Sequence, residues 1–410
     1  VSQIRRGVLD LIGGARASIA DPFLPTKIRE GNSDDIRECI GCNICITGDM
    51  TMSISRCTQN PTFMEEWRKG WHPEQMNAKG ASSSALVVGT GPAGMEAALS
   101  LAKRGYDVAL AEAKTEVGGR LTLERKLPGL SAWGRVIDYR EYQLGKLSNA
   151  ETYFDSELSA DQVLEFGFEN VCVATGSSWR ADGVSRQHVR PIERHGDMPV
   201  FTPDDLMAGR LPTGKVVLYD DDHYYMGGVL AELLVSNGCA VSFVVPSAYV
   251  SDWTINTLEQ ETIQRRLLEM GVEIHLNRGL AKMEAQSVLT NCTYTDQLTR
   301  LDADAVVIVG SRLPEDRLYQ ALKAREDEWA DAGVRSVSLI GDANAPGPIA
   351  WATYAGHRYA RELDGENIGD ALPFKCLFLL PCEYASRYRG HLLRHHHHQN
   401  HHHHHHHHHH

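Results

Sequence analysis

A glycine-rich turn between two apolar segments constrains the fold of this chain more than any other feature. The stretch "ALVVGTGPAGMEAALSLAKRGYDVALAEA" places a predicted strand at 85–88, a helix that ends at Gly105, and a second strand at 108–111. In such a β-α-β unit, a G-x-G-x-x-G turn lets a pyrophosphate approach the helix N-terminus, and an acidic residue at the tip of the second strand accepts ribose hydroxyls. The stretch therefore predicts a site for ADP or an adenine dinucleotide, formed by Gly89, Gly91, Pro92, Ala93, Gly94 and Glu112.

Three later segments fit the same nucleotide domain. "VGGR" at 117–120 supplies a second bare loop, "VCVATGS" is a predicted strand that ends at Thr175, and "SVSLIGDANAPGP" is a strand followed by Asp342. In two-dinucleotide flavoproteins an Asp in this place holds a flavin ribityl hydroxyl, although Asp342 could equally cap a helix. No Cys-x4-Cys follows the Gly-Gly loop, which excludes disulfide-reductase chemistry. These segments add Gly119, Arg120, Thr175, Gly176 and Asp342 to the predicted site.

A second doubly wound unit is predicted downstream, without its glycines. "KVVLYDDD" is a predicted strand, "GGVLAELLVSNG" a helix and "CAVSFVVP" a strand, so the alternation repeats. Asp221, His223 and Tyr224 stand where a working nicotinamide site needs glycines, and the aspartates would repel a pyrophosphate. We therefore predict that the turn 220–225 does not bind a nicotinamide nucleotide; tolerance of NADH by an unusual turn is the alternative.

Four cysteines form the strongest metal motif. Cys39, Cys42 and Cys45 are separated by two residues each, and Cys57 follows after eleven more. Three closely spaced thiolates can bind three corners of a cubane, and a fourth from a following loop completes it. Zinc sites more often use two separated Cys-x2-Cys pairs, so we predict a [4Fe–4S] cluster, with zinc or structural thiols as alternatives. A cysteine cluster accompanied by scattered single cysteines fits a reducing compartment, and hence the cytoplasm.

The first segment, "RRGVLDLIGGARASIADPFLPTKIREG", contains a possible phosphate loop. We predict a helix that stops at Gly7, a buried strand at 8–12, a tight loop at 13–16, and a helix that begins at Asp21-Pro22. Bare backbone N–H groups and the planar fork of Arg16 suit a phosphate at the end of a strand. An ordinary strand–loop–helix with a surface arginine is the alternative.

Composition excludes several classes of protein. The 410 residues carry a formal net charge of -12, which argues against nucleic-acid binding. No apolar stretch approaches the ~18 residues that a membrane span requires, and no secretory signal is present. Most of the 21 histidines lie in 395–410, which has the form of a purification tag. The chain opens at Val1 in what resembles the middle of a fold, so we expect further residues upstream.

Together these motifs resemble the trimethylamine dehydrogenase family of iron–sulfur flavoproteins. The matching stretches are "GARASIADPFLP", "DDIRECIGCNICI", "RCTQNP", "GWHPE", "GTGPAG", "VATGS", "YDDDHYYMGGVLAE" and "GDANAPGPIA…GHRYAREL". The resemblance implies an α/β protein: the C-terminal end of a (β/α)8 barrel that binds FMN, a [4Fe–4S] loop, then two doubly wound nucleotide-binding-like domains, one inserted in the other. It implies that Gly14, Ala15 and Arg16 contact the FMN phosphate, that ADP (or FAD) fills the first nucleotide site, and that Cys39, Cys42, Cys45 and Cys57 hold the cluster.

The resemblance also sets the expected boundaries and activity. We predict a barrel end at 1–36, a cluster segment and linker at 37–79, an ADP-binding domain at 80–205 and 335–390, and an inserted domain at 206–334. The expected activity is oxidative N-demethylation or deamination of a small amine, with electrons passing from FMN through the cluster to an electron-transferring flavoprotein. The catalytic groups would lie upstream of Val1, and a homodimer is expected. An NADPH-dependent 2,4-dienoyl-CoA reductase-like enzyme, or an isolated electron-transfer fragment, is the alternative.

Overall fold

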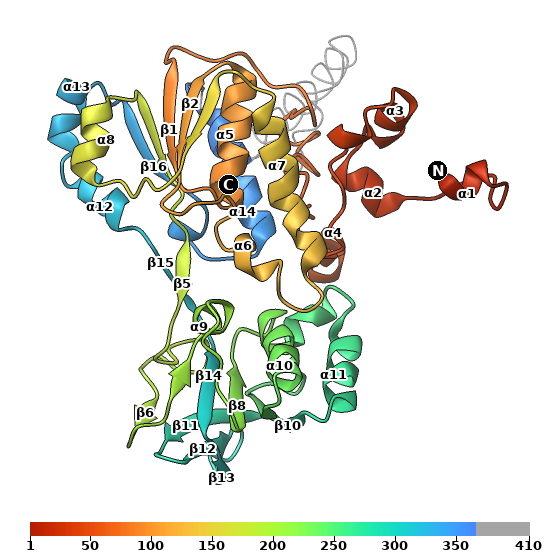
Figure 1. Cartoon of the computed structure of the whole chain (residues 1–410), viewed down its shortest axis with the longest axis vertical. Coiled ribbons are helices and arrows are strands. Elements are labelled where there is room, and N and C mark those ends of the chain that lie inside the picture. Colours follow the sequence, from red (N-terminus) through yellow and green to blue (C-terminus); the bar gives the residue numbers. More distant parts are fainter. Residues whose placement is uncertain (366–410) are drawn as a thin grey trace, which may run out of the picture.

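Two parallel β-sheets organise the chain, and an N-terminal arm extends from one side of the unit that contains the first sheet (Figure 1). The structure is a computed structural model, and it describes residues 1–365. The first sheet has the strand order β16-β4-β1-β2-β3, and every pairing in it is parallel. Its strands are β1 (Ser84–Val88), β2 (Asp107–Ala111), β3 (Ala150–Tyr153), β4 (Asn170–Val173) and β16 (Ser336–Leu339).

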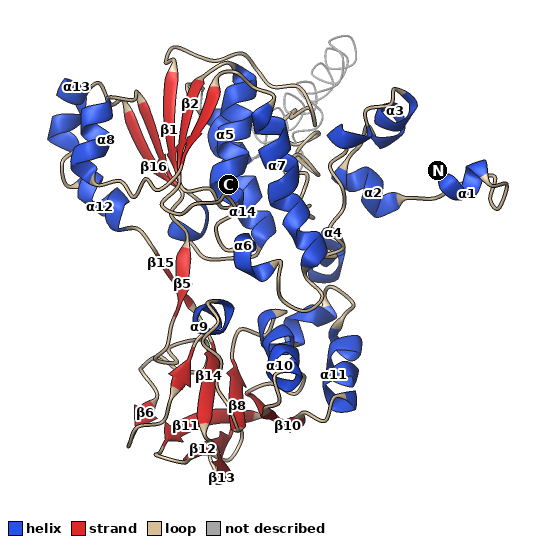
Figure 2. Cartoon of the chain, viewed as in Figure 1, coloured by secondary structure: helices blue, strands red, loops and turns tan. Residues whose placement is uncertain are grey.

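Helices cover both faces of the first sheet, as the buried apolar runs of β1, β2 and β4 require. The β1–α5–β2 unit forms as predicted: Pro92 begins α5, and Gly105 ends it in the left-handed conformation with a φ of 101°. One face carries α5 (Pro92–Arg104), α6 (Leu121–Glu124), η2 (Ser131–Gly134), α7 (Arg135–Gly145) and α14 (Ile349–Glu362). The other carries α8 (Ala160–Phe166), α12 (Arg317–Lys323), η4 (Glu326–Glu328) and α13 (Trp329–Ala332), as Figure 2 shows.

The second unit is also built on a parallel sheet, but it has a helical layer on one face and a smaller sheet on the other. Its parallel sheet has the order β10-β9-β8-β14-β7, where β8 (Lys215–Asp220) lies at the centre. The other strands are β7 (Val200–Phe201), β9 (Ala240–Val245), β10 (Glu273–Leu276) and β14 (Ala305–Val309). Its helices are α9 (Pro203–Met207), α10 (Met226–Ser236), η3 (Asp252–Ile255) and α11 (Gln260–Glu269). The smaller sheet contains β6 (Glu193–Arg194), β11 (Arg278–Met283), β12 (Ser287–Cys292) and β13 (Leu298–Asp302).

A two-stranded antiparallel ribbon joins the two units. Its strands are β5 (Ser177–Trp179) and β15 (Arg312–Pro314). The chain leaves the first unit along β5 and returns along β15. Strand β7 comes before residue 206 and already belongs to the second sheet. Leu322 and Trp329 come before residue 334 and are already buried in the core of the first unit. The crossing points therefore differ from the predicted boundaries at 206 and 334, because short strands and helices with weak patterns flank both.

The N-terminal arm corrects two local predictions. It contains α1 (Ser2–Arg5), α2 (Ala15–Ala20), α3 (Leu24–Arg29), η1 (Ser33–Asp35) and α4 (Ile44–Thr51). Residues 8–12 are exposed and form no strand, because the described residues offer them no neighbouring strand. Asp21 does not cap a helix; it ends α2 and is fully buried, and α3 begins only at Leu24. Gly7 follows α1 with a φ of 71°, as predicted.

None of the helices in residues 1–365 is long and apolar enough to cross a membrane. The predicted tag at 395–410 and the end of the predicted ADP-binding domain at 366–390 lie outside the described residues.

Candidate cofactor sites

A pocket of about 330 Å³ opens at the carboxyl ends of the first sheet's strands. This is where parallel α/β sheets bind ligands. The pocket is lined by Gly89, Gly91, Pro92, Ala93, Glu112, Gly119, Arg120, Thr175, Gly176 and Asp342, all of which were predicted from the sequence. Only Gly94 of the predicted nucleotide residues is absent from the lining.

The glycines of the turn are required by close backbone contacts. A Cβ on Gly89 would lie 2.1 Å from the carbonyl oxygen of Ala174, and the φ of Gly89 is 107°. A Cβ on Gly94 would lie 1.9 Å from the carbonyl oxygen of Gly89, so Gly94 keeps helix α5 against strand β1. A Cβ on Gly119 would lie 2.7 Å from the Cα of Gly91, which brings the two loops together over the pocket. The cradle leaves room for a pyrophosphate and no room for side chains.

Glu112 stands at the tip of β2, where a ribose acceptor is expected. Its Oε2 accepts a hydrogen bond from the backbone N–H of Thr90 at 3.2 Å and another from the Thr90 hydroxyl. Its Oε1 accepts from the backbone N–H of Lys114 at 3.3 Å. These donors fix the carboxylate at the edge of the pocket that it lines, in a position where it can accept further hydroxyl donors.

Asp342 is the centre of an ion-pair network. Its Oδ2 accepts from Arg120 Nη1 at 3.0 Å and from Arg312 Nη1 at 2.5 Å, and its Oδ1 accepts from the backbone N–H of Gly347 at 3.1 Å. Arg120 also donates through Nε to Glu124 Oε1 at 3.1 Å and through Nη2 to the Tyr225 hydroxyl at 2.9 Å. Burial alone would lower the pKa of Arg120, but Glu124, Tyr225 and Asp342 raise it well above its usual value. The network thus fixes Arg120, Arg312 and Asp342 at the wall of the pocket.

All four predicted cluster cysteines line a single small cavity. Cys39, Cys42, Cys45 and Cys57 share its wall with Arg16, Ile19, Ile40, Asn43, Thr58 and Gln59. The cysteines form no disulfide. Helix α4 carries Cys45, the loop before it carries Cys39 and Cys42, and the loop after it carries Cys57. The fold thus brings together the residues that the spacing predicted.

The donors around the sulfurs fit a cofactor bound through thiolates. The backbone N–H of Gly41 donates to Cys39 Sγ at 3.4 Å, and the backbone N–H of Asn60 donates to Cys57 Sγ at 3.3 Å. Such N–H bonds stabilise charge on sulfur. Burial raises the pKa of the Cys42 thiol to about 11, so this thiol is protonated at neutral pH unless a cation replaces the proton. Within residues 1–365 no three His, Cys, Asp or Glu side chains are grouped so that they could hold one metal ion.

Arg16, the predicted phosphate ligand, reaches the same cavity. It lies in the first turn of α2, after the Gly13-Gly14 loop, and its Nη1 donates to Asn43 Oδ1 at 2.5 Å. Gly14, Ala15 and Arg16 are exposed in this chain. Asn43 was not predicted from the sequence; its left-handed φ of 58° between two cluster cysteines was the available signal.

The turn after β8 is filled by its own side chains. Asp220 is fully buried, and its Oδ1 accepts from the backbone N–H groups of Asp222 and His223 at 2.9 and 3.1 Å. Asp221 Oδ1 lies 2.9 Å from His223 Nε2. The ring of Tyr224 packs edge-on against that of Tyr225, with centroids 4.8 Å apart. The side chains of the turn thus bond and pack against one another, and Asp221, Tyr224 and Tyr225 also line an adjacent cavity of about 460 Å³.

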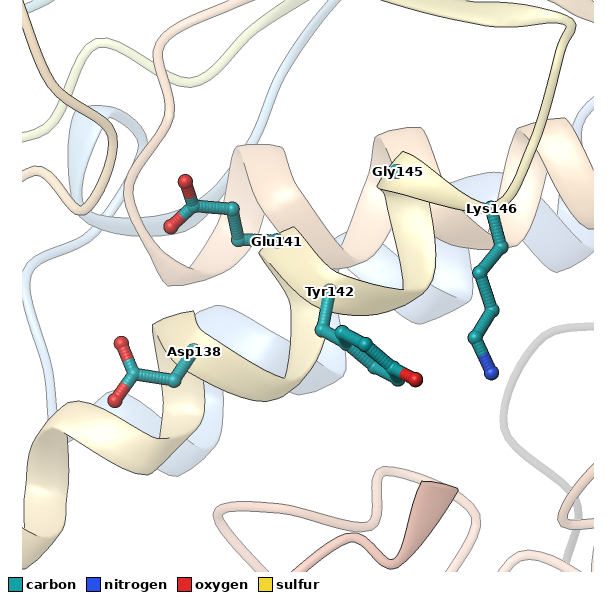
Figure 3. Close-up of a pocket in the computed structure, with 5 residues that line it drawn as sticks. All are labelled: Asp138, Glu141, Tyr142, Gly145 and Lys146. Atoms are coloured by element: carbon teal, nitrogen blue, oxygen red, sulfur yellow. The ribbon is translucent and has the colours of Figure 1, made fainter. Parts of the chain in front are cut away.

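A separate surface groove lies on helix α7, away from every predicted site residue. Asp138, Glu141, Tyr142 and Lys146 project from the outer side of the helix, as Figure 3 shows. The groove is charged and open, and the predicted cofactor residues do not line it.

Two family models match the chain. One is described as an NAD(P)-binding Rossmann-like domain and matches residues 87–142; the other is described as an OYE-like second alpha/beta domain and matches residues 201–300. The dimethylamine dehydrogenase of Hyphomicrobium sp. (strain x) is 39% identical, over 91% of this chain and 54% of its own length. The chain belongs to the trimethylamine dehydrogenase family. The sequence resemblance is thereby confirmed.

Solved structures agree with this membership. Histamine dehydrogenase from Rhizobium sp. 4-9 is 64% identical with a TM-score of 0.89, over 91% of this chain and 58% of that one. The 6-hydroxypseudooxynicotine amine oxidase of Pseudomonas geniculata N1 is 50% identical with a TM-score of 0.85, over 88% of this chain and 54% of that one. The chain spans little more than half the length of each of these relatives, which are amine-oxidising enzymes.

Proposed function

We propose that this chain is the electron-transfer and nucleotide-binding portion of an amine dehydrogenase. The observation that carries the proposal is the four-cysteine cavity with Arg16 at its wall. Dimethylamine and histamine dehydrogenases are among the relatives, so a small amine is the proposed substrate class. A [4Fe–4S] cluster, when bound, supplies single-electron transfer to a partner, proposed to be an electron-transferring flavoprotein. The catalytic residues are proposed to precede Val1, and the enzyme to be a cytoplasmic homodimer.

Each part of the chain has a defined task in this proposal. The cysteines hold the cluster, the apolar side chains of Ile19 and Ile40 exclude water from it, and the N–H groups of Gly41 and Asn60 stabilise charge on the sulfurs. Arg16, with the loop of Gly14 and Ala15, is proposed to bind the FMN phosphate. That arm then places the flavin-binding part of the enzyme next to the cluster cavity.

ADP is the proposed occupant of the nucleotide pocket in preference to FAD. The glycine cradle and Glu112 suit a pyrophosphate and a ribose, which both nucleotides possess. A flavin would also need Asp342 as a ribityl acceptor. That carboxylate already accepts hydrogen bonds from Arg120, Arg312 and Gly347. ADP has no redox ring, so its proposed task is structural.

The NADPH-dependent reductase alternative requires an open second turn. Asp221, Tyr224 and Tyr225 stand there in place of glycines, and carboxylates at this position would repel a pyrophosphate. Electrons are therefore proposed to leave through the cluster and not to enter from a nicotinamide.

The proposal is tested by the purified chain's content and by its response to nucleotides. Denaturation should release the bound nucleotide, and chromatography should identify it as ADP. Iron analysis should find about four irons per chain, the content of a [4Fe–4S] cluster. Release of FAD, together with reduction of the chain by NADPH, would support the reductase instead. Absence of iron after anaerobic loading would refute the cluster, and ADP release is independent of that result.

A further inference from the structure

The side chain of Asn43 connects three parts of the chain that are distant in sequence. Its Oδ1 accepts from Arg16 Nη1 at 2.5 Å, and its Nδ2 donates to the carbonyl oxygen of Thr257 at 2.9 Å. Asn43 itself lies between Cys42 and Cys45 and lines the cysteine cavity. One amide therefore joins the phosphate arm, the cluster loop and the inserted unit.

Thr257 determines which way the amide of Asn43 points. A carbonyl oxygen accepts hydrogen bonds only, so it must face the NH2 group of the amide. The amide oxygen then faces Arg16, whose guanidinium can only donate hydrogen bonds. A reversed amide would set two donors against each other at Arg16 and two acceptors against each other at Thr257. The orientation that holds Arg16 thus depends on the inserted unit.

The loop that presents Thr257 is fixed by the turn that lacks its glycines. Thr257 is fully buried, and its hydroxyl donates to the carbonyl oxygen of Thr254 at 3.0 Å. The backbone N–H of Trp253 donates to the carbonyl oxygen of His223 at 3.0 Å. The ring of Trp253 stacks on Tyr224, with centroids 4.9 Å apart and an interplanar angle of 25°. The side chains that replaced the nucleotide turn therefore support this loop.

The position of Arg16 matters because its charge lies at the wall of the cysteine cavity. Reduction adds negative charge to an iron–sulfur cluster, so a nearby cation favours the reduced form and raises the reduction potential. Arg16 is exposed, so without the hydrogen bond to Asn43 its guanidinium can move away from the cavity, and greater distance and solvent screening then weaken this effect.

We propose that Asn43 is a positioning residue: held by Thr257 of the inserted unit, it keeps Arg16 beside the cluster and raises the cluster's reduction potential. This inference rests on the proposed function, because it requires a cluster at the four cysteines. It assigns the inserted unit a task in electron transfer that needs no nicotinamide.

The experiment is a redox titration of the iron-loaded chain, followed by the electron paramagnetic resonance signal of the reduced cluster. Asn43→Gly keeps the left-handed backbone and removes the amide, and Arg16→Ala removes the cation. Each should shift the reduction equilibrium about tenfold toward the oxidised cluster, which is 59 mV for a one-electron couple. The double variant should shift it no further than Arg16→Ala alone, because both changes remove the same charge. Arg29→Ala, which removes an exposed cation from the same arm but outside the cavity, should leave the potential unchanged.

A second pair of variants tests the link from outside the cavity and serves if Asn43→Gly fails to load iron. Trp253→Ala removes the ring that stacks on Tyr224 and should lower the cluster's reduction potential, as Asn43→Gly does. Trp253→Phe keeps an aromatic ring and should leave the potential close to that of the wild type. An unchanged potential in Asn43→Gly, or additive shifts in the double variant, would overturn the inference. If only Trp253→Ala can be loaded with iron, an unchanged potential in that variant would also overturn the inference. A wild-type chain that shows no such signal would instead overturn the cluster itself.

Discussion

Replacing Glu96 by Gln should strongly destabilise the first unit, because it leaves a buried cation without its counter-charge. Arg140 is fully buried on α7, and its Nε donates to Glu96 Oε2 of α5 at 2.8 Å. Its Nη1 donates to Gln59 Oε1 at 2.8 Å and its Nη2 to the carbonyl oxygen of Gln59 at 2.9 Å. The same guanidinium therefore joins the two helices to the segment that follows Cys57.

The expected loss is about 3–5 kcal/mol in the free energy of unfolding, the usual effect of removing one partner from a buried pair. Urea unfolding with hydrogen exchange in 92–104 and 135–145 measures it, because these helices contain the pair. Asp161→Asn is the control: its partner Arg325 is on the surface, so little change is expected. The double variant Glu96→Gln, Arg140→Met should lose less free energy of unfolding than Glu96→Gln alone, because the charge of Arg140 is then no longer left buried without a partner. A loss below ~1 kcal/mol for Glu96→Gln would refute the buried-charge reasoning.

The pH dependence of the wild type provides a second test of this pair. Burial alone would raise the pKa of Glu96, but Arg140 and His357 hold it well below its usual 4.5. The carboxylate's contribution is therefore complete above pH ~4.5 and is lost as the pH falls through the lower, folded value. Burial lowers the pKa of His357, so acid also favours the unfolded chain through this residue. Stability should fall steadily below pH ~6, and less steeply in Glu96→Gln.

Three further predictions follow from the site geometry. Gly94→Ala should abolish ADP binding or weaken its binding free energy by about 1–3 kcal/mol, because the added Cβ would lie 1.9 Å from the carbonyl oxygen of Gly89. Calorimetric titration with ADP measures this affinity, and an unchanged affinity would contradict the prediction. Cys42→Ser should remove the iron–sulfur absorbance near ~400 nm, whereas Cys292→Ser, outside the cavity, should retain it; unchanged iron in Cys42→Ser would exclude that cysteine as a ligand. Burial, and then Asp220, raise the pKa of Asp222 from its usual 3.8 to about 7, so this carboxyl destabilises the fold increasingly as the pH rises through this range and fully above it. Asp222→Asn should therefore raise the melting temperature at pH 8 and change it little at pH 4, and equal effects at both would argue against the shift.

The sequence predicted features in which one local pattern determines a structure. The β1–α5–β2 unit follows from glycine spacing, because close backbone contacts tolerate no other residue at Gly89 and Gly94. The shared cavity of Cys39, Cys42 and Cys45 follows from their short spacing, and Cys57 joins them from the loop that follows the eight-residue helix α4. The absence of nicotinamide binding at the turn 220–225 stays a prediction.

Features that depend on contacts between distant segments were not predictable. Arg312 joins Asp342 only because β15 pairs with β5, and nothing near Arg312 in the sequence indicates that partner. Val8 to Ile12 has the apolar pattern of a buried strand, but a strand needs neighbours, and the described residues provide none. The contact between Asn43 and Thr257 crosses more than half of the chain and depends on how the two units meet.

The ribbon of β5 and β15 makes the second unit a detachable piece. Trp179 and Arg312 are paired across this ribbon, so the chain enters and leaves the insertion at two adjacent positions. A short turn could replace everything between them without stretching the first sheet. In such a shortened chain the ADP pocket should keep its glycine cradle, while Asn43 would lose the carbonyl that orients it. The insertion could thus be removed without disturbing the first sheet, but not without removing the carbonyl group of Thr257 that Asn43 contacts.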